Sequence, residues 1–208
     1  MSGTFPSSPA PRRVRFRSHQ PARVSVAHSL KRQSRTRNAQ RWGLSLEFPG
    51  MDRVDFAPIF AFVVSQRGPF DTFQYVLPAP LHTPQGVGAV GSPNPYVDNT
   101  TTSPTENQTG RSIITLGWPA SVTVLKAMDF FKFGSHSKVY MAREDVASDG
   151  SGRATIPMEP AALQSLADGE GIQTHSLPFT VALTEEQQEF LLEVDPEFGF
   201  SLDLVEAF

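Results

Sequence analysis

The 208-residue sequence contains no cysteine, which excludes disulfide bonds, thiol nucleophiles and thiolate metal sites. It has no run of eighteen apolar residues, so we expect no transmembrane helix. The first residues lack the apolar stretch of a secretory signal. No Gly-x-Ser-x-Gly elbow and no phosphate-binding loop occurs. We therefore expect a protein that is not an enzyme and that binds no cofactor and no metal ion.

The remaining candidates for chemistry are scattered along the chain. The five histidines occur singly, and no pair has the spacing of a metal site on a helix face. Glycines 86, 88 and 91 form a G-x-G-x-x-G pattern, but the prolines on both sides preclude the strand and helix of a dinucleotide site. Asp145 and Asp149 lie near glycines, yet the other ligands of a calcium loop are missing. We interpret the segment around Asp145 and Asp149 as a hairpin turn.

Charges of opposite sign are separated along the chain, although the net charge is only −3. Residues 1–46 contain ten Lys and Arg and no acid, whereas residues 154–208 contain eleven Asp and Glu and no Lys or Arg. Three interpretations remain open: the two ends pair within one fold, they meet between subunits, or the basic end binds nucleic acid. The candidate subunit-interface residues are Arg13, Arg15, Arg17, Glu185, Glu186 and Glu189.

The three glutamates of this set lie in a polar link between predicted strands. Paired catalytic carboxylates are one interpretation of such a cluster. A solvated run, or one that faces the lumen of a channel, fits the polar link better.

A strand, a helix and a second strand are predicted between residues 41 and 78. Apolar residues occupy every second position over residues 42–48, the pattern of a half-buried strand. Asp52 is a suitable helix N-cap, so we predict a helix over residues 52–67. The helix is apolar over most of its circumference, so we expect it to be largely buried, with a kink near Pro58.

The end of the chain contains the clearest alternation, over residues 198–204. A strand of this kind must pair with another, and we predict that it pairs with residues 42–48. Residues 112–160 consist of short apolar runs separated by turns and form a small β unit of their own. With 18 prolines and 15 glycines, the composition also favours short strands and turns. We predict a mainly β fold with one principal α-helix and an inserted β domain.

Residues 42–78, 117–160 and 198–208 together resemble the distal tail proteins of long-tailed phages with non-contractile tails. In these phages the distal tail protein forms the ring between the tail tube and the tail tip. The resemblance covers roughly residues 41–208. One departure is Met128, where the family pattern has a glycine before Asp129.

The resemblance implies a tail-tube-like β-sandwich or barrel made of residues 12–84 and 172–208, with the helix packed against it. Residues 85–111 would be a loop or linker, and residues 112–171 an inserted barrel-like domain. Residues 1–11, which are rich in Ser and Pro, are predicted to be an arm that is ordered only when a partner holds it.

The implied function is that of a structural virion protein made in the host cytoplasm. Its copies would form a hexameric ring that lines the DNA channel, with the tail tube protein and the tail tip or hub proteins as partners. DNA would be present only in passage, and no membrane insertion is expected. The charge-bearing ends would supply the two complementary patches that a closed ring needs.

Other functions stay open. The chain could be another tail component, such as a tube, terminator or tip protein. Residues 12–41 could serve a nucleic-acid-binding module, which would bind DNA with a steep salt dependence. The middle β unit could bind carbohydrate with Trp118 and Tyr140 as stacking platforms, although both are more simply core residues.

Overall fold

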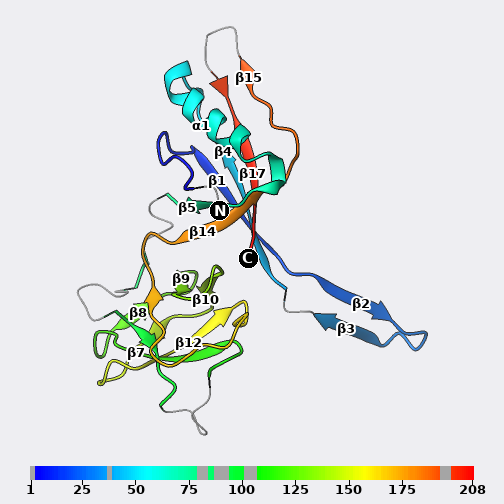
Figure 1. Cartoon of the computed structure of the whole chain (residues 1–208). Coiled ribbons are helices and arrows are strands. Elements are labelled where there is room, and N and C mark those ends of the chain that lie inside the picture. The colour runs from blue at the N-terminus through cyan, green and yellow to red at the C-terminus, as the bar shows by residue number, and fades with distance from the viewer. Residues whose placement is uncertain (1–2, 37–38, 79–83, 87–93, 101–106, 193–197) are drawn as a thin grey trace. The chain divides into compact units, whose positions relative to one another are not determined.

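The computed structural model describes residues 3–36, 39–78, 84–86, 94–100, 107–192 and 198–208. The fold is mainly β, with 42% strand and 9% helix, as predicted. The chain divides into two compact units (Figure 1): unit 1 is Met1–Tyr75 with Thr180–Phe208, and unit 2 is Val76–Phe179. Unit 2 is thus inserted into unit 1, with boundaries that differ from the predicted 84/85 and 171/172.

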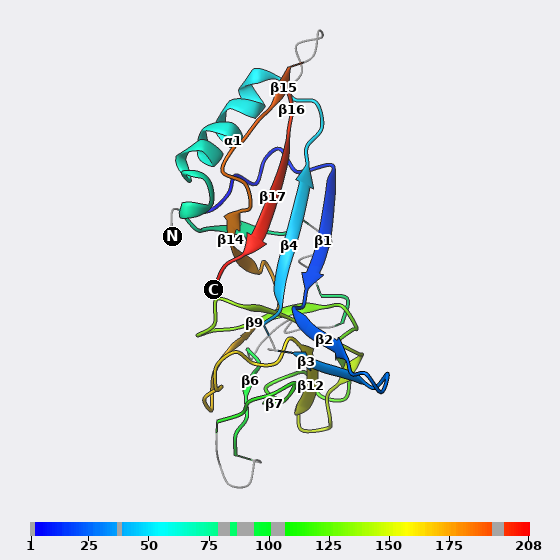
Figure 2. The ribbon, with the colours of Figure 1, turned by 90° about the vertical axis from the view of Figure 1, so that its right-hand side faces the viewer.

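Unit 1 is built on a five-stranded sheet in the order β1-β4-β17-β14-β5. The strands are β1 (Arg13–His19), β4 (Arg41–Glu47), β5 (Phe73–Val76), β14 (Pro178–Leu183) and β17 (Ser201–Glu206). Figure 2 shows β1, β4 and β17 side by side. Both neighbours of β4 are antiparallel to it, and Leu46 lies opposite Val14 on one side and Leu202 on the other. The predicted pairing of the C-terminal strand with residues 42–48 is therefore confirmed.

One helix covers part of this sheet. α1 (Arg53–Ser65) begins at Asp52, whose carboxylate accepts a hydrogen bond from the Asp55 amide at 2.9 Å, as an N-cap should. A 3-10 turn, η1 (Gly68–Phe70), follows it. The prediction of a largely buried helix is wrong, since Val54 and Val64 are 79% and 56% exposed. The subunit covers one side of α1, through Phe56, Ile59 and Val63.

The first described residues belong to the core of unit 1. The Phe5 amide donates to the Gln74 carbonyl at 2.8 Å, and the Gln74 amide donates to the Gly3 carbonyl at 2.9 Å. Phe5 is buried, and its ring contacts those of Phe48, Phe62, Phe73 and Tyr75. For residues 3–5 the prediction of an arm ordered only by a partner is therefore wrong, because the subunit itself holds them.

Two further ribbons extend from unit 1. β2 (Ala22–Val26) pairs with β3 (Arg32–Thr36), so the β1–β4 hairpin continues beyond the sheet as a two-stranded arm. β15 (Leu191–Leu192) pairs with β16 (Phe198–Gly199) near α1. The Phe198 ring stacks on Phe56 of the helix at 4.7 Å between centroids, which fixes this second ribbon beside α1.

Unit 2 is a nearly closed, six-stranded barrel-like sheet in the order β13-β9-β10-β12-β7-β6. Its strands are β6 (Tyr96–Val97), β7 (Ser112–Leu116), β9 (Phe130–Phe133), β10 (Val139–Ala142), β12 (Ala154–Glu159) and β13 (Ile172–Gln173). The first and last strands meet, because the Ile172 amide donates to the Pro95 carbonyl at 2.8 Å and the Val97 amide donates to the Glu170 carbonyl at 2.9 Å. A short ribbon of β8 (Thr123–Leu125) and β11 (Val146–Ala147) completes the unit.

The described part of the predicted linker, residues 85–111, belongs to unit 2. Residues 96–97 form β6, and Gln108 is buried among the strands. Residues 87–93 and 101–106 lie outside the described residues. The turn-rich sequence predicted a loop here because two-residue strands have too little periodicity to be recognised.

Candidate functional site

Among the described residues, no cluster of three or more His, Asp or Glu side chains could hold a metal ion. In the same part of the chain, no helix is both long and apolar enough to span a bilayer. The described residues instead offer a buried polar network in unit 2 and three surfaces of unit 1: the face of β1, the arm and the open side of α1.

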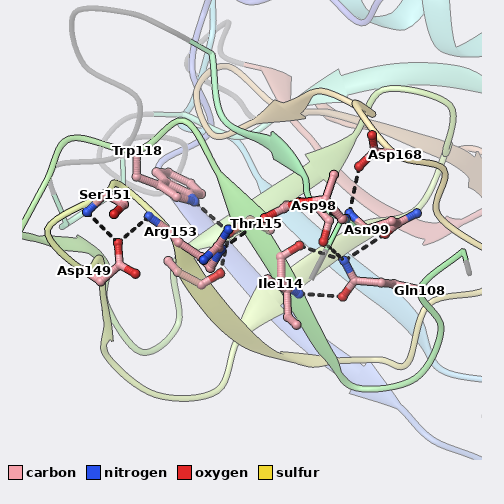
Figure 3. Close-up of polar contacts among 12 residues, drawn as sticks. Asp98, Asn99, Gln108, Ile114, Thr115, Trp118, Asp149, Ser151, Arg153 and Asp168 are labelled. Atoms are coloured by element: carbon pink, nitrogen blue, oxygen red, sulfur yellow. Dashed lines mark hydrogen bonds and ion pairs between the residues drawn. The ribbon is translucent and has the colours of Figure 1, made fainter. Parts of the chain in front are cut away.

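The polar network of unit 2 centres on the buried carboxylate of Asp98 (Figure 3). One Asp98 oxygen accepts from the Thr100 amide at 3.0 Å and from the Thr100 hydroxyl, and the other accepts from Arg153 Nε at 3.0 Å. The Thr100 hydroxyl is the largest cause of a lowered pKa at Asp98, and Arg153 adds to it, while burial opposes the shift. Asp98 is therefore held as a paired anion.

Gln108 extends the network to β7. Its side-chain nitrogen donates to the carbonyls of Asp98 and Ile114, both at 2.9 Å, and to the side-chain oxygen of Asn99 at 3.0 Å. Its side-chain oxygen accepts from the Ile114 amide at 2.6 Å. Because each polar group is bonded, we interpret the network as a brace that closes the barrel rather than as a reaction centre.

The aromatic residues proposed as carbohydrate platforms are core residues. Trp118 and Tyr140 are both buried. The Trp118 indole donates to the Thr115 hydroxyl at 2.7 Å, and the Tyr140 hydroxyl bonds to the His136 ring at 2.7 Å. Neither ring is available to stack on a ligand, so the carbohydrate interpretation is wrong for these two residues.

The glycine pattern is explained by packing where it is described. A Cβ at Gly86 would lie 2.5 Å from the Val124 carbonyl oxygen, so only glycine permits this approach to β8. The Gly86 amide donates to the Asp129 carboxylate at 3.0 Å. Glycines 88 and 91 lie outside the described residues.

A tight turn lies near residue 149 as predicted, but the strands on its two sides, β11 and β12, pair with other strands, so it does not close a hairpin. The Asp149 carboxylate accepts from the amides of Ser151 and Arg153 at 2.8 and 2.9 Å, and these bonds lower its pKa. Asp145 instead accepts from the Ala127 amide at 2.9 Å. Both carboxylates thus organise turns of the backbone.

The three arginines predicted at a subunit interface lie on β1, and two of them are paired within the subunit. Arg13 lies 3.2 Å from the Glu47 carboxylate, and Arg17 lies 3.1 Å from the Asp203 carboxylate of β17. Arg12 also bonds to Glu47 and is the largest cause of the lowered pKa of that carboxyl group. Among the described residues Arg15 forms no ion pair. The two ends of the chain therefore do pair within one fold, at Arg17 and Asp203.

The acidic set lies in the link between β14 and β15. Glu185, Glu186 and Glu189 are exposed, and within the described residues they form no ion pair. The backbone of residues 185–186 lies against Gly68, just beyond the C-terminal end of α1. Glu189 lines a shallow pocket together with Arg12 and Glu47. No ion pair within the subunit joins this set to Arg13, Arg15 or Arg17 among the described residues.

The β2–β3 arm, defined as Ala22–Thr36, was not foreseen as a ribbon. Every described side chain of its two strands is exposed, including Val24 at 51% and Val26 at 63%. Leu30 at its tip is 85% exposed and adopts a φ of +61°. Residues 22–27 alternate only weakly and residues 29–40 are polar and basic, a pattern that predicts an exposed loop or hairpin tip, because a ribbon without a buried face gives weak alternation.

The α1 groove is an open apolar depression of about 710 Å³ between α1 and the segment that carries Phe190 and Phe198. It is lined mainly by Phe56, Phe60, Ala61, Val64, Phe190 and Phe198, with Arg53 at its N-terminal end. Rings of Phe56, Phe60 and Phe190 contact one another at 5.1 to 5.3 Å between centroids. A helix that is apolar over most of its circumference is the signal for this groove in the sequence, since part of that apolar surface lines the groove.

No protein-family model matches the sequence, and a search of curated proteins gave no match. What the protein does must therefore be inferred from its own surfaces and from the resemblance described above.

Proposed function

We propose that this protein is a structural subunit that self-associates into a ring, the distal tail ring of a long-tailed phage with a non-contractile tail. The observation that carries the proposal is the unfinished surface of unit 1. Its sheet joins both ends of the chain, yet the arm and one face of α1 have nothing covering them among the described residues.

Such surfaces are costly for a solitary protein. A two-stranded hairpin is marginally stable in water without further packing, and contiguous apolar surface marks an interaction site. The arm and the α1 groove are different surfaces, so a contact between them is heterologous, and heterologous contacts close into rings or extend into fibres. A ring subunit accounts for both features at once.

The position of the ring in the particle rests on the resemblance. The tail tube protein and the tail tip or hub proteins are the proposed neighbours, and the virion is the proposed location. DNA would pass through the channel without stable binding, because phosphate contacts need free Lys and Arg. Arg12, Arg13 and Arg17, on the sheet, are engaged by Glu47 and Asp203. Unit 2, as an inserted barrel, is free to carry attachments.

The second candidate is a nucleic-acid-binding module. The arm favours it, because Arg23, Lys31, Arg32 and Arg35 are exposed and form no ion pair within the described residues. Two-stranded ribbons do enter DNA grooves. Nucleic-acid binding would not explain why Val24 and Val26 are exposed, since phosphates attract charge rather than aliphatic side chains.

Electron microscopy tests the proposal. The purified protein, alone and mixed with its tail partners, should form rings with a central channel, and antibodies against unit 2 should label the distal end of the tail. A strict monomer in every mixture, together with a tail that assembles without the protein, would contradict the proposal.

A further inference from the structure

The arm presents two faces with different requirements. Val24 and Val26 share one face, where they lie opposite Ser34 and Arg32. On the other face Arg23 lies directly opposite Arg35. Like charges in opposed positions destabilise a ribbon, so the arm needs an apolar surface on one face and acidic groups on the other.

The α1 groove offers both. Its floor is aromatic and aliphatic, and Val64 forms its wall near the C-terminal end of the helix. Beside that end run Glu185 and Glu186, whose backbone lies against Gly68. Both glutamates are exposed, and among the described residues neither has a basic partner. The last turn of α1 contains no basic residue, so its carbonyl end also attracts cations.

We propose that the arm of one copy lies in the α1 groove of a second copy. Val24, Val26 and Leu30 cover the aromatic floor, and the arginines of the arm meet Glu185 and Glu186 at the C-terminal end of α1. The proposal rests on the proposed self-association and names its contact. Charge balance supports a second copy as the occupant, since unit 1 holds twelve basic and twelve acidic residues.

The arm of a subunit does not reach the groove of the same subunit. The arm joins β4 at Arg41, whereas α1 follows the opposite end of that strand at Glu47. At roughly 3.3 Å per residue these ends lie about 20 Å apart. Figures 1 and 2 both show the arm leaving the sheet in the direction away from α1. The contact is therefore between copies.

Because the chain has no cysteine, disulfide trapping tests the contact without background. A tagged Val26→Cys chain is mixed with an untagged Val64→Cys chain under mild oxidation. We expect mixed dimers at a yield at least about tenfold above that with Val54→Cys, because only a bound thiol has a high effective concentration. Val54 is the matched control, since it is exposed on α1 but does not line the groove.

A charge exchange provides a second test of the contact. Arg23→Glu with Arg35→Glu should lower the yield of the mixed dimer several-fold, and adding Glu185→Arg with Glu186→Arg to the groove-bearing chain should restore it. Equal yields at Val64 and Val54, in a protein that still forms rings, would overturn this contact and leave the proposed function standing. Binding of a random DNA duplex that requires Arg23 and Arg35, without trapping, would overturn it in favour of nucleic acid.

Discussion

His136 is a buried titratable residue in the barrel of unit 2. Its Nδ1 bonds to the Tyr140 hydroxyl at 2.7 Å, and its Nε2 has no hydrogen-bond partner among the described residues. Burial lowers the pKa of His136, while the charge of Glu170 opposes the shift. Burial disfavours the charged imidazolium, so the folded state keeps the ring neutral.

This arrangement predicts a pH dependence of stability. Below the ordinary histidine pKa of 6.5, His136 is protonated in the unfolded chain but stays neutral in the folded chain, because its folded-state pKa is lower. The contribution of His136 is thus complete above pH 6.5 and is lost as the pH falls toward the lowered pKa of the folded state. Urea unfolding between pH 8 and pH 5 should show this loss, and His136→Gln, which keeps a polar partner for Tyr140, should reduce it.

The matched control is His28→Gln, at the exposed tip of the arm, which should follow the wild-type curve. Identical slopes for the wild type and His136→Gln would show that the neutral ring is not the cause. Three carboxylates also have lowered pKa values: Glu47, Asp98 and Asp149. Their contributions to stability are lost only below their ordinary pKa values of 4.5 and 3.8, so they do not change stability between pH 8 and pH 5.

Met128 occupies a backbone position that favours glycine, as its departure from the family pattern indicates. It adopts a φ of +76°, a left-handed conformation that favours glycine, at the position where the resemblance has a glycine. Asp129 holds this turn, because its carboxylate accepts from the Lys126 amide at 2.8 Å and the Gln85 amide at 2.8 Å. The turn therefore keeps its shape with a methionine in the strained position.

At the scale of elements, the N-terminal segment is held to unit 1 chiefly by one side chain. Phe5 lies among four aromatic rings, whereas only two backbone hydrogen bonds join residues 3–5 to Gln74. Phe5→Ala should lower the free energy of unfolding by about 3 kcal/mol, the usual cost of removing a buried ring. Chemical denaturation monitored by circular dichroism measures the change.

Phe70→Ala is the control for that measurement, because Phe70 is 74% exposed and lies under the Arg67 guanidinium at 4.5 Å. It should cost about 1 kcal/mol or less. If Phe5→Ala were as stable as Phe70→Ala, the segment would be held by its backbone bonds instead, and the aromatic anchor would be of no consequence.

Elements with one buried face could be predicted, and those without one could not. Strands β4 and β17 alternate strictly because the sheet has a core side, and Asp52 marked the start of α1. Among the side chains of the arm whose burial is described, none is buried, so nothing forced the sequence of the arm into a pattern. Phe5 stands alone in a Ser/Pro-rich run, where a single apolar residue has no periodicity.

The same logic limits what could be predicted of the candidate surfaces. The charge separation pointed to contacts within or between subunits, and the structure assigns Arg13 and Arg17 to pairs within the subunit. It leaves Arg15 and the three glutamates in no ion pair among the described residues. Which apolar face of α1 stays open depended on how much of the helix the sheet could cover, which no local pattern encodes.

At the scale of the whole molecule, function follows from what unit 1 leaves uncovered. One chain contributes both an arm with exposed Val24 and Val26 and a groove of about 710 Å³ lined by aromatic side chains. In the proposed ring, these surfaces are covered by other copies of the same chain. The inserted barrel of unit 2, closed and braced by its own polar network, adds a separate body to each subunit.

The mass of the full chain in solution tests this account most directly. In sedimentation equilibrium over a range of concentrations, the wild type should reach multiples of 22.8 kDa. Val26→Asp should remain folded by circular dichroism yet shift toward the single-chain mass, because a carboxylate cannot enter an apolar groove without a large cost. A wild-type mass of 22.8 kDa at every concentration, alone and in mixtures with its tail partners, would contradict the account.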